Sequence, residues 1–228
     1  QLVCNSCKWK IPNMYAESAK IKNLALFDFD GTLCTKDSFT GFIFYALKKR
    51  HIVKQGIKIL PWIQAYFLNI YPADSMRPRL FKAMFADMPT QELLELALEY
   101  SHQLRNSLDQ QIYQQLLKHK HNDDDVVIVS ASVDLYLKDI AELLDVNLIC
   151  TEAEVKDGVF TGLFSTPDCS REQKKIRVLE QYNIDQYEAI YAYGNSHEDL
   201  DMFSLADYSY MVGEDQLLPS IRPQKKLA

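Results

Sequence analysis

Short apolar segments alternate with longer amphipathic ones along much of the chain. Five segments are short and apolar, as buried strands are, and they cover residues 24–28, 126–129, 147–150, 189–193 and 208–212. Residues 135–144, between the second and third of these segments, repeat their apolar positions at helical spacing. Strands that alternate with helices predict a parallel sheet covered by helices on both faces.

A long helical region separates the first predicted strand from the second. From about residue 38 to residue 120, apolar side chains recur at helical spacing, as Phe42, Ile43, Ala46 and Leu47 do. Prolines at positions 61, 72, 78 and 89 divide this region into four or five helices. The region is too long to be a connection between strands, so it predicts an inserted domain.

The predicted fold class is therefore α/β, with a three-layer parallel-sheet core and an inserted all-helical cap. The core is assigned to residues 21–36 and 122–228, the cap to residues 37–121, and residues 1–20 to an N-terminal extension. Local signals add helix N-caps at Thr90, Asn106, Ser132 and Ser196, a capping box at Ser170 and Gln173, and a hairpin turn at Asp157-Gly158.

Composition narrows the class of protein. The net charge of −6 argues against a dedicated nucleic-acid-binding protein. The five cysteines are odd in number and scattered, which favours a reducing, cytoplasmic compartment over a disulfide framework. Cys4 and Cys7 have no second pair of ligands to complete a zinc site. No apolar run is long enough to cross a bilayer, which takes about 18 residues.

Two acids end the first predicted strand. Asp28 and Asp30 are two residues apart, so an extended chain points both side chains the same way. Paired carboxylates repel each other unless a cation or a proton lies between them. A hard cation such as Mg²⁺ takes oxygen ligands of this kind. A polar junction between a strand and a turn is the alternative interpretation of these residues.

Two further strands end in polar residues. Ser130, Ala131 and Ser132 follow the second strand, and residues 194–199 follow the fourth. In parallel sheets, ligands bind beyond the carboxyl ends of the strands. Lys174 and Lys175 stand at the start of a predicted helix, where a cation suggests a nearby anion. Together these groups predict a site for a metal ion and a phosphate.

The motif Asp28-Phe29-Asp30-Gly31-Thr32-Leu33 resembles the first motif of the haloacid dehalogenase superfamily. The polar groups at Ser130, at the two lysines and at residues 194–199 follow in the order of that family's other motifs. The resemblance covers about residues 21–213 and implies the family's Rossmann-like core. It is greatest to the subfamily IB branch, which holds phosphoserine phosphatases and phosphatidylglycerophosphatase C-like enzymes with helical caps.

The resemblance implies a role for each site residue. Asp28 would be the nucleophile that takes the phosphoryl group, and Asp30 the general acid and then the general base. Ser130 and Ala131 would bind the phosphate. Mg²⁺ would be bound by Asp28, the Asp30 carbonyl and Asn195, with Asp199 supporting that loop.

Two details remain open in this comparison. Lys175 is preferred to Lys174 as the phosphate-binding lysine, because Ile176, Val178 and Leu179 then match the family's apolar helix positions. The family's fourth motif begins Gly-Asp, and here it begins Gly194-Asn195. An Asn oxygen can still bind Mg²⁺, but the site has one negative charge fewer.

The sequence therefore predicts a Mg²⁺-dependent phosphatase that forms an aspartyl-phosphate, as a cytoplasmic monomer or homodimer. Its substrate is expected to be a small phosphomonoester, phosphoserine-like, or the phosphate of a lipid head group. Basic residues at 48–58 beside the aromatic stretch 61–68 raise the hypothesis that the cap contacts an anionic membrane. The alternative is packing of those aromatics inside the cap. The alternative function is binding or regulation without turnover.

Overall fold

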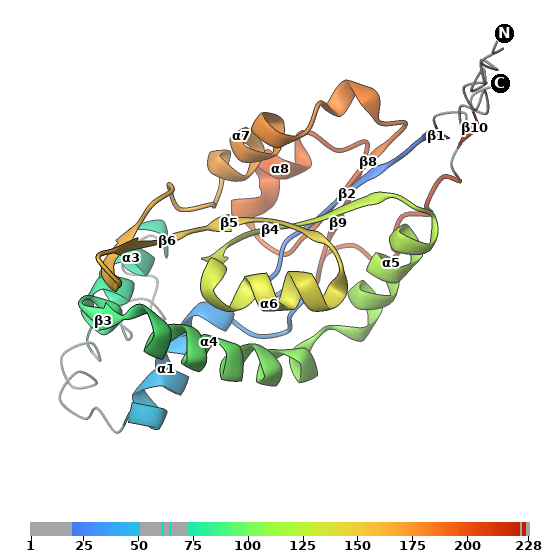
Figure 1. Cartoon of the computed structure of the whole chain (residues 1–228). Helices are drawn as coiled ribbons and strands as arrows, with labels where there is room; N and C mark the ends of the chain where they lie inside the picture. Colours follow the sequence, from blue (N-terminus) through green and yellow to red (C-terminus); the bar gives the residue numbers. More distant parts are fainter. Residues whose placement is uncertain (1–19, 51–60, 62–63, 65–72, 224, 227–228) are drawn as a thin grey trace, which may run out of the picture.

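A five-stranded parallel sheet forms the centre of the protein. The computed structural model describes residues 20–50, 61, 64, 73–223 and 225–226. Within them the sheet order is β5-β4-β2-β8-β9 (Figure 1). In that order the strands span Asn147–Thr151, Asp125–Val133, Leu24–Phe27, Ile190–Gly194 and Tyr208–Met211. All four pairings are parallel, which confirms the predicted α/β core.

Helices cover both faces of this sheet (Figure 1). One face carries α7 (Glu172–Gln181) and α8 (Leu200–Phe203). The other carries α5 (Gln110–His121) and α6 (Asp134–Leu144), and α4 (Thr90–Leu104) packs on α6. Short 3-10 helices lie at Arg105–Ser107, Ile184–Gln186 and His197–Asp199. The central strands are thus buried on both sides, as their continuous apolar sequences require.

Alternation along the strands divides the core into two clusters. Leu24 and Leu26 of β2 pack with residues of α7 and α8. Ala25 and Phe27 pack on the opposite face, in a larger cluster that continues into α1 (Ser38–Arg50) and α3 (Ala73–Phe85). Because successive side chains of a strand point to opposite faces, β2 packs against both helical layers.

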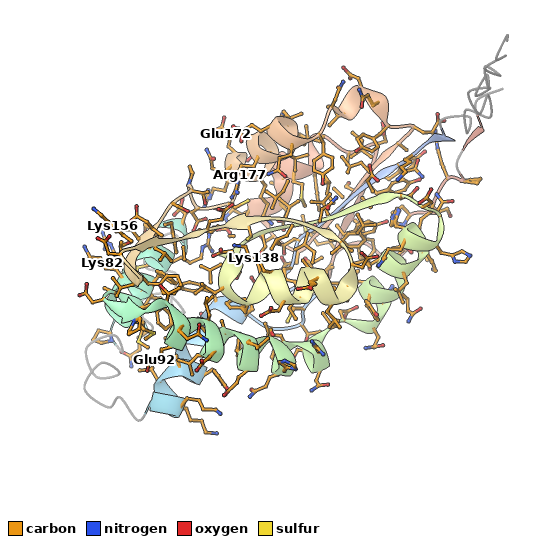
Figure 2. All side chains as sticks on the ribbon, viewed as in Figure 1. Lys82, Glu92, Lys138, Lys156, Glu172 and Arg177 are labelled. Atoms are coloured by element: carbon orange, nitrogen blue, oxygen red, sulfur yellow. The ribbon has the colours of Figure 1, made fainter. Side chains whose placement is uncertain are left out.

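The segment assigned to the cap is more varied than the sequence suggested. Besides α1, α3 and α4 it contains the two-residue strand β3 (Met88–Pro89). This strand pairs with β7 (Val159–Phe164), which pairs with β6 (Ala153–Lys156). The expected all-helical cap thus has a small antiparallel sheet at its edge. Lys82 of α3 and Lys156 of β6 mark this end of the molecule in Figure 2.

Helix α5 lies against the core sheet, although the predicted boundary placed it in the cap. His119 of α5 is fully buried, and its Nε2 lies 2.8 Å from the Tyr193 hydroxyl of β8. Gln115 donates to the same hydroxyl over 3.0 Å. The boundary at residue 121 stays a prediction, but these contacts join the last helix before it to the core.

The local signals had mixed outcomes. The Asp157-Gly158 turn is confirmed, because both residues have positive φ and join β6 to β7. Ser196 caps its 3-10 helix as predicted. The other predicted caps were wrong, because the N-cap residues are Pro89, Asp109, Val133 and Arg171. The hydroxyl of Ser132 donates to Asp30.

The two ends of the described chain lie side by side. β1 (Lys20–Ile21) pairs with β10 (Lys225–Lys226) beyond the amino end of β2. No helix within the described ranges has the length and apolar character needed to span a bilayer. Cys4, Cys7 and nearly all of the predicted extension lie outside the described residues, as does most of the aromatic stretch at 61–68.

Two glycines of the β6–β7 hairpin allow a matched test of how it packs on α3. Both have φ near +80°, but a Cβ on Gly162 would lie 2.9 Å from the Ala86 Cβ, and one on Gly158 would meet nothing. Gly158→Ala should cost about 1 kcal/mol of unfolding free energy from backbone strain alone. Gly162→Ala should cost about 1–3 kcal/mol more from overpacking. Urea unfolding measures both, and equal losses would contradict the packing.

Candidate active site

A pocket of about 330 Å³ lies at the carboxyl ends of β2, β4 and β8. Asp28, Asp30, Ala131, Lys174, Asn195 and Asp199 are all among its lining residues. These are six of the eight candidate residues from the sequence. The parallel topology brings them together from four segments that are far apart in the chain.

Asp28 follows β2 directly and is almost fully buried. Its Oδ1 accepts a hydrogen bond from Lys174 Nζ at 2.6 Å, and its Oδ2 accepts one from Thr32 Oγ1 at 3.1 Å. Burial raises the pKa of Asp28 to about 7, since the lowering effect of Lys174 is opposed by the nearby carboxylates of Asp199 and Asp30. The carboxyl group is thus fixed in direction at the pocket floor.

Lys174, rather than Lys175, is the lysine of this pocket. Its side chain is 2% exposed, and Nζ also donates to Asp199 Oδ1 at 2.5 Å. Burial opposes its charge, but Asp28 and Asp199 outweigh that effect and raise its pKa above the ordinary value. Lys175 donates to Ser204 at the surface. The preference for Lys175 is corrected, because Lys174 shares the buried face of α7 with Val178, four residues on.

Asp199 organises the loop that carries Asn195. Its Oδ2 accepts hydrogen bonds from the backbone N–H groups of Asn195 at 3.0 Å and Ser196 at 3.1 Å. This close packing requires Gly194, where a Cβ would lie 2.7 Å from Asp199. Asn195 itself is exposed and lines the pocket. A Cβ on Gly31 would lie 2.0 Å from its Nδ2, so the Asn195 side chain lies directly against the loop after Asp30.

Asp30 lies where the core meets the cap. Its Oδ1 accepts from the backbone N–H of Ser38, the first residue of α1, at 2.6 Å. Its Oδ2 accepts from the Ser132 hydroxyl at 2.5 Å. Burial and then the nearby Asp37 raise the pKa of Asp30 to about 6, although both serine donors lower it. A carboxyl group with such a pKa can carry a proton and release it near neutrality.

Ser130 is the candidate that the structure leaves behind the pocket wall. It is fully buried, and its Oγ accepts from the backbone N–H of Ser132 at 3.1 Å. The lining at the end of β4 is formed by Ala131 and Ser132 instead. Its predicted contact with a phosphate oxygen therefore stays a prediction.

Sequence reasoning missed an arginine in the pocket wall. Arg77 of α3 is 6% exposed and forms a two-pronged ion pair with Asp168, at 2.7 and 2.9 Å. It also lies 3.4 Å from Glu198. These contacts join the cap to two loops of the core. The sequence offered no clear signal, since α3 also carries Asp74, Arg79 and Lys82, which are exposed or partly exposed, and nothing local distinguishes Arg77 from them.

The donor atoms suit a small hard cation. A bound Mg²⁺ would find oxygen groups of the type that it prefers in the carboxylate of Asp28, the backbone carbonyl of Asp30 and the side-chain amide of Asn195, all residues that line the pocket. Among the described residues, no group of three or more His, Cys, Asp or Glu side chains is placed to hold a metal ion. A metal here would therefore need the carbonyl and amide oxygens. The pocket is lined by five acids and three basic residues, so a bound cation would reduce an excess of negative charge; they are Asp28, Asp30, Asp37, Glu198 and Asp199, and Lys36, Arg77 and Lys174.

Comparisons with known proteins identify the family and the fold. A family profile described as haloacid dehalogenase-like hydrolase matches residues 25–204. A protein of unknown function from Bordetella pertussis Tohama I has a similar structure, with a TM-score of 0.71 and 24% identity over 83% of this chain and 89% of that one. No curated protein sequence matches the chain.

Two solved phosphatase structures also resemble the fold. A substrate-bound phosphoserine phosphatase gives a TM-score of 0.61 and 20% identity, covering 84% of this chain and 86% of that one. A probable phosphoserine phosphatase from Vibrio cholerae gives a TM-score of 0.64 and 16% identity, covering 82% of this chain and 55% of that one. At these identities the likeness establishes the fold, and the site must be argued from its own residues.

The Arg77 contacts can be tested by a double-mutant cycle. Arg77→Met leaves Asp168, whose side chain is only 11% exposed, without its cation, and we expect a loss of about 3 kcal/mol in unfolding free energy. Adding Asp168→Asn should recover part of that loss, because the stranded charge is then removed. Urea unfolding of the four proteins measures the coupling. Additive losses would show that the two side chains do not interact.

Proposed function

The chain belongs to the haloacid dehalogenase-like hydrolase family, and from that premise we propose that it is a phosphatase acting through Asp28. One observation carries the proposal. In a pocket at the end of β2, the buried ammonium of Lys174 fixes the Asp28 carboxylate and leaves it facing the pocket. A nucleophilic carboxylate and a fixed cation beside it are what transfer of an anionic phosphoryl group needs.

The proposed reaction has two steps. An oxygen of Asp28 attacks phosphorus, the bond to the leaving oxygen breaks, and the Asp30 carboxyl gives its proton to that oxygen. Asp30 then takes a proton from water, which attacks phosphorus and releases inorganic phosphate from Asp28. Lys174 stabilises negative charge on the phosphoryl oxygens through both steps.

Mg²⁺ is proposed as the cofactor, held by Asp28, the Asp30 carbonyl and Asn195. When bound, it would neutralise charge between the nucleophile and the phosphate. The protein's own side chains would position the metal ligand and the phosphate. Asp199 holds the Asn195 loop and shares the Lys174 ammonium, so it supports both the metal ligand and the phosphate-binding cation.

We propose a small phosphomonoester as the substrate. A volume of about 330 Å³ is at the lower end for small-molecule sites, which fits a compact metabolite. The membrane hypothesis rests mostly on residues outside the described ranges. Of its basic residues, Lys49 forms an ion pair with Glu99 at 2.7 Å, which reduces the positive charge that it could offer to a lipid. Contact of the cap with lipid therefore stays a prediction.

Loss of the nucleophile gives the first test of this function. Asp28→Asn keeps the shape of the side chain but removes its charge, so Mg²⁺-dependent hydrolysis of 4-nitrophenyl phosphate should fall by at least about a thousandfold. Circular dichroism should show an intact fold. Asp157→Asn, at the exposed hairpin turn, is the matched control and should keep full activity. Full activity in Asp28→Asn would rule out this mechanism.

The metal ligand gives a second test. Asn195→Asp restores a negative charge to the ligand set, so Mg²⁺ should bind at least about fivefold more tightly, as charge count tunes such sites. Calorimetric titration measures this without any substrate, and EDTA should abolish hydrolysis by the unmodified protein. Unchanged or weaker binding would show that Asn195 is not a ligand. A protein that binds phosphate but never turns it over would favour the regulatory alternative.

A further inference from the structure

The end of β4 carries a hydroxyl that none of the proposed steps uses. Ser132 is 1% exposed, yet its oxygen lies at the pocket and donates to Asp30 Oδ2 at 2.5 Å. The Ser132 hydroxyl does not cap helix α6, because the N-cap residue of α6 is Val133. A buried hydroxyl aimed at a carboxyl group that must move a proton calls for an explanation in terms of that carboxyl group.

Ser132 is itself held by a chain of hydroxyls. Its Oγ lies 3.1 Å from Ser38 Oγ, and Ser38 Oγ lies 3.2 Å from the Tyr136 hydroxyl. Ser38 and Tyr136 are fully buried. The backbone carbonyl of Ser38 also accepts a hydrogen bond from the Tyr100 hydroxyl at 2.9 Å. Helices α1, α4 and α6 thus all contribute to the support of one serine side chain.

The direction of these hydrogen bonds follows from counting protons. Each hydroxyl has one proton to donate. With the Ser132 proton on Asp30, Ser38 donates to Ser132 and Tyr136 donates to Ser38. The chain therefore ends with the Ser132 hydroxyl on Asp30 Oδ2, and the Ser38 side chain also lies close enough to Asp30 to stabilise its charge. The second fixed donor, the Ser38 backbone N–H, lies on Oδ1.

We propose that Ser132 is a positioning residue for the proton transfer by Asp30. This rests on the proposed function, because it assigns Ser132 to the acid step of that reaction. With donors fixed on both oxygens, the Asp30 carboxyl cannot rotate freely about its last bond. Its proton is then delivered to one place in the pocket, where the oxygen of the departing alcohol or phenol takes it as the bond to phosphorus breaks. Geometry of this kind matters because small displacements slow a reaction sharply.

The test compares two substrates of similar size that differ in their need for an acid. Phenyl phosphate releases a phenolate about as basic as that of tyrosine, with a pKa of about 10, and needs the proton. 4-Nitrophenyl phosphate releases a far less basic phenolate and needs it much less. In the full chain with Mg²⁺, Ser132→Ala should lower kcat/KM for phenyl phosphate about tenfold and for 4-nitrophenyl phosphate less than about threefold. The tenfold loss is only a part of what general acid catalysis contributes, because Asp30 itself is still present.

Controls separate this effect from general damage. Ser101→Ala removes another buried serine hydroxyl, which donates to the Leu98 carbonyl in α4, and should leave the ratio of the two kcat/KM values unchanged. Ser38→Ala removes the support of Ser132 and the Ser38 side chain beside Asp30, but keeps Ser132 and the backbone N–H on Asp30, so it should shift the ratio in the same direction by a smaller factor. It also decides the matter if Ser132→Ala does not fold.

The outcomes are distinct. Equal losses on both substrates, or no loss, in Ser132→Ala would overturn the positioning role while leaving the proposed function intact. If Ser132→Ala does not fold, an unchanged ratio in Ser38→Ala would have the same meaning. Inactivity of the unmodified protein on both phosphates would overturn the proposed function, and the role of Ser132 with it.

Discussion

The buried ion pairs of Lys174 are the interaction on which the candidate site depends. One ammonium group, 2% exposed, lies between carboxylates that follow β2 and β8. Charges buried to this degree are tolerated only when they are paired and hydrogen-bonded. The end of β2, the start of α7 and the loop after β8 must therefore be in place together. Displacing any one of these three segments would leave a buried charge without its partner.

A rigid support behind the site keeps those strand ends in register. Phe27, just before Asp28, stacks on Tyr193 with ring centroids 4.3 Å apart. The Tyr193 hydroxyl lies 2.8 Å from His119 Nε2, and His119 Nδ1 lies 2.7 Å from Asp124. This buried network joins β2, β8 and α5. It explains in physical terms why α5 packs with the core, since moving it with a cap would expose His119 and break the network.

The sequence was informative where local chemistry decides the structure. A buried parallel strand needs a continuous apolar run, and an Asp-Gly turn needs two residues that tolerate positive φ, so both were predicted correctly. It was less informative where a side chain had two uses. Ser132 could cap α6 or donate to Asp30, and only the position of Asp30 in space decides between them.

The choice between the two lysines failed for a related reason. Ile176 and Leu179 remain partly or largely exposed, so the apolar pattern of α7 did not mark its buried face. That face holds Lys174 and Arg177 beside Val178. Arg177 lies between α7 and β5, where it donates to the Cys150 carbonyl (Figure 2). When two of the buried side chains of a helix are cations, the pattern of apolar residues alone does not identify its buried face.

The boundary between cap and core combines two kinds of contact. Near the pocket the contacts are polar: Arg77 with Asp168, and the Ser38 N–H with Asp30. Other contacts are apolar and continuous. The ring centroids of Phe42 in α1 and Tyr136 in α6, for example, are 5.2 Å apart. Separating that layer would expose core surface, at about 25 cal/mol for each Å². Because α1 and α3 both contribute to this apolar layer, burial holds the cap on the core, and the Ser38 N–H of α1 stays on Asp30 as long as that layer is intact.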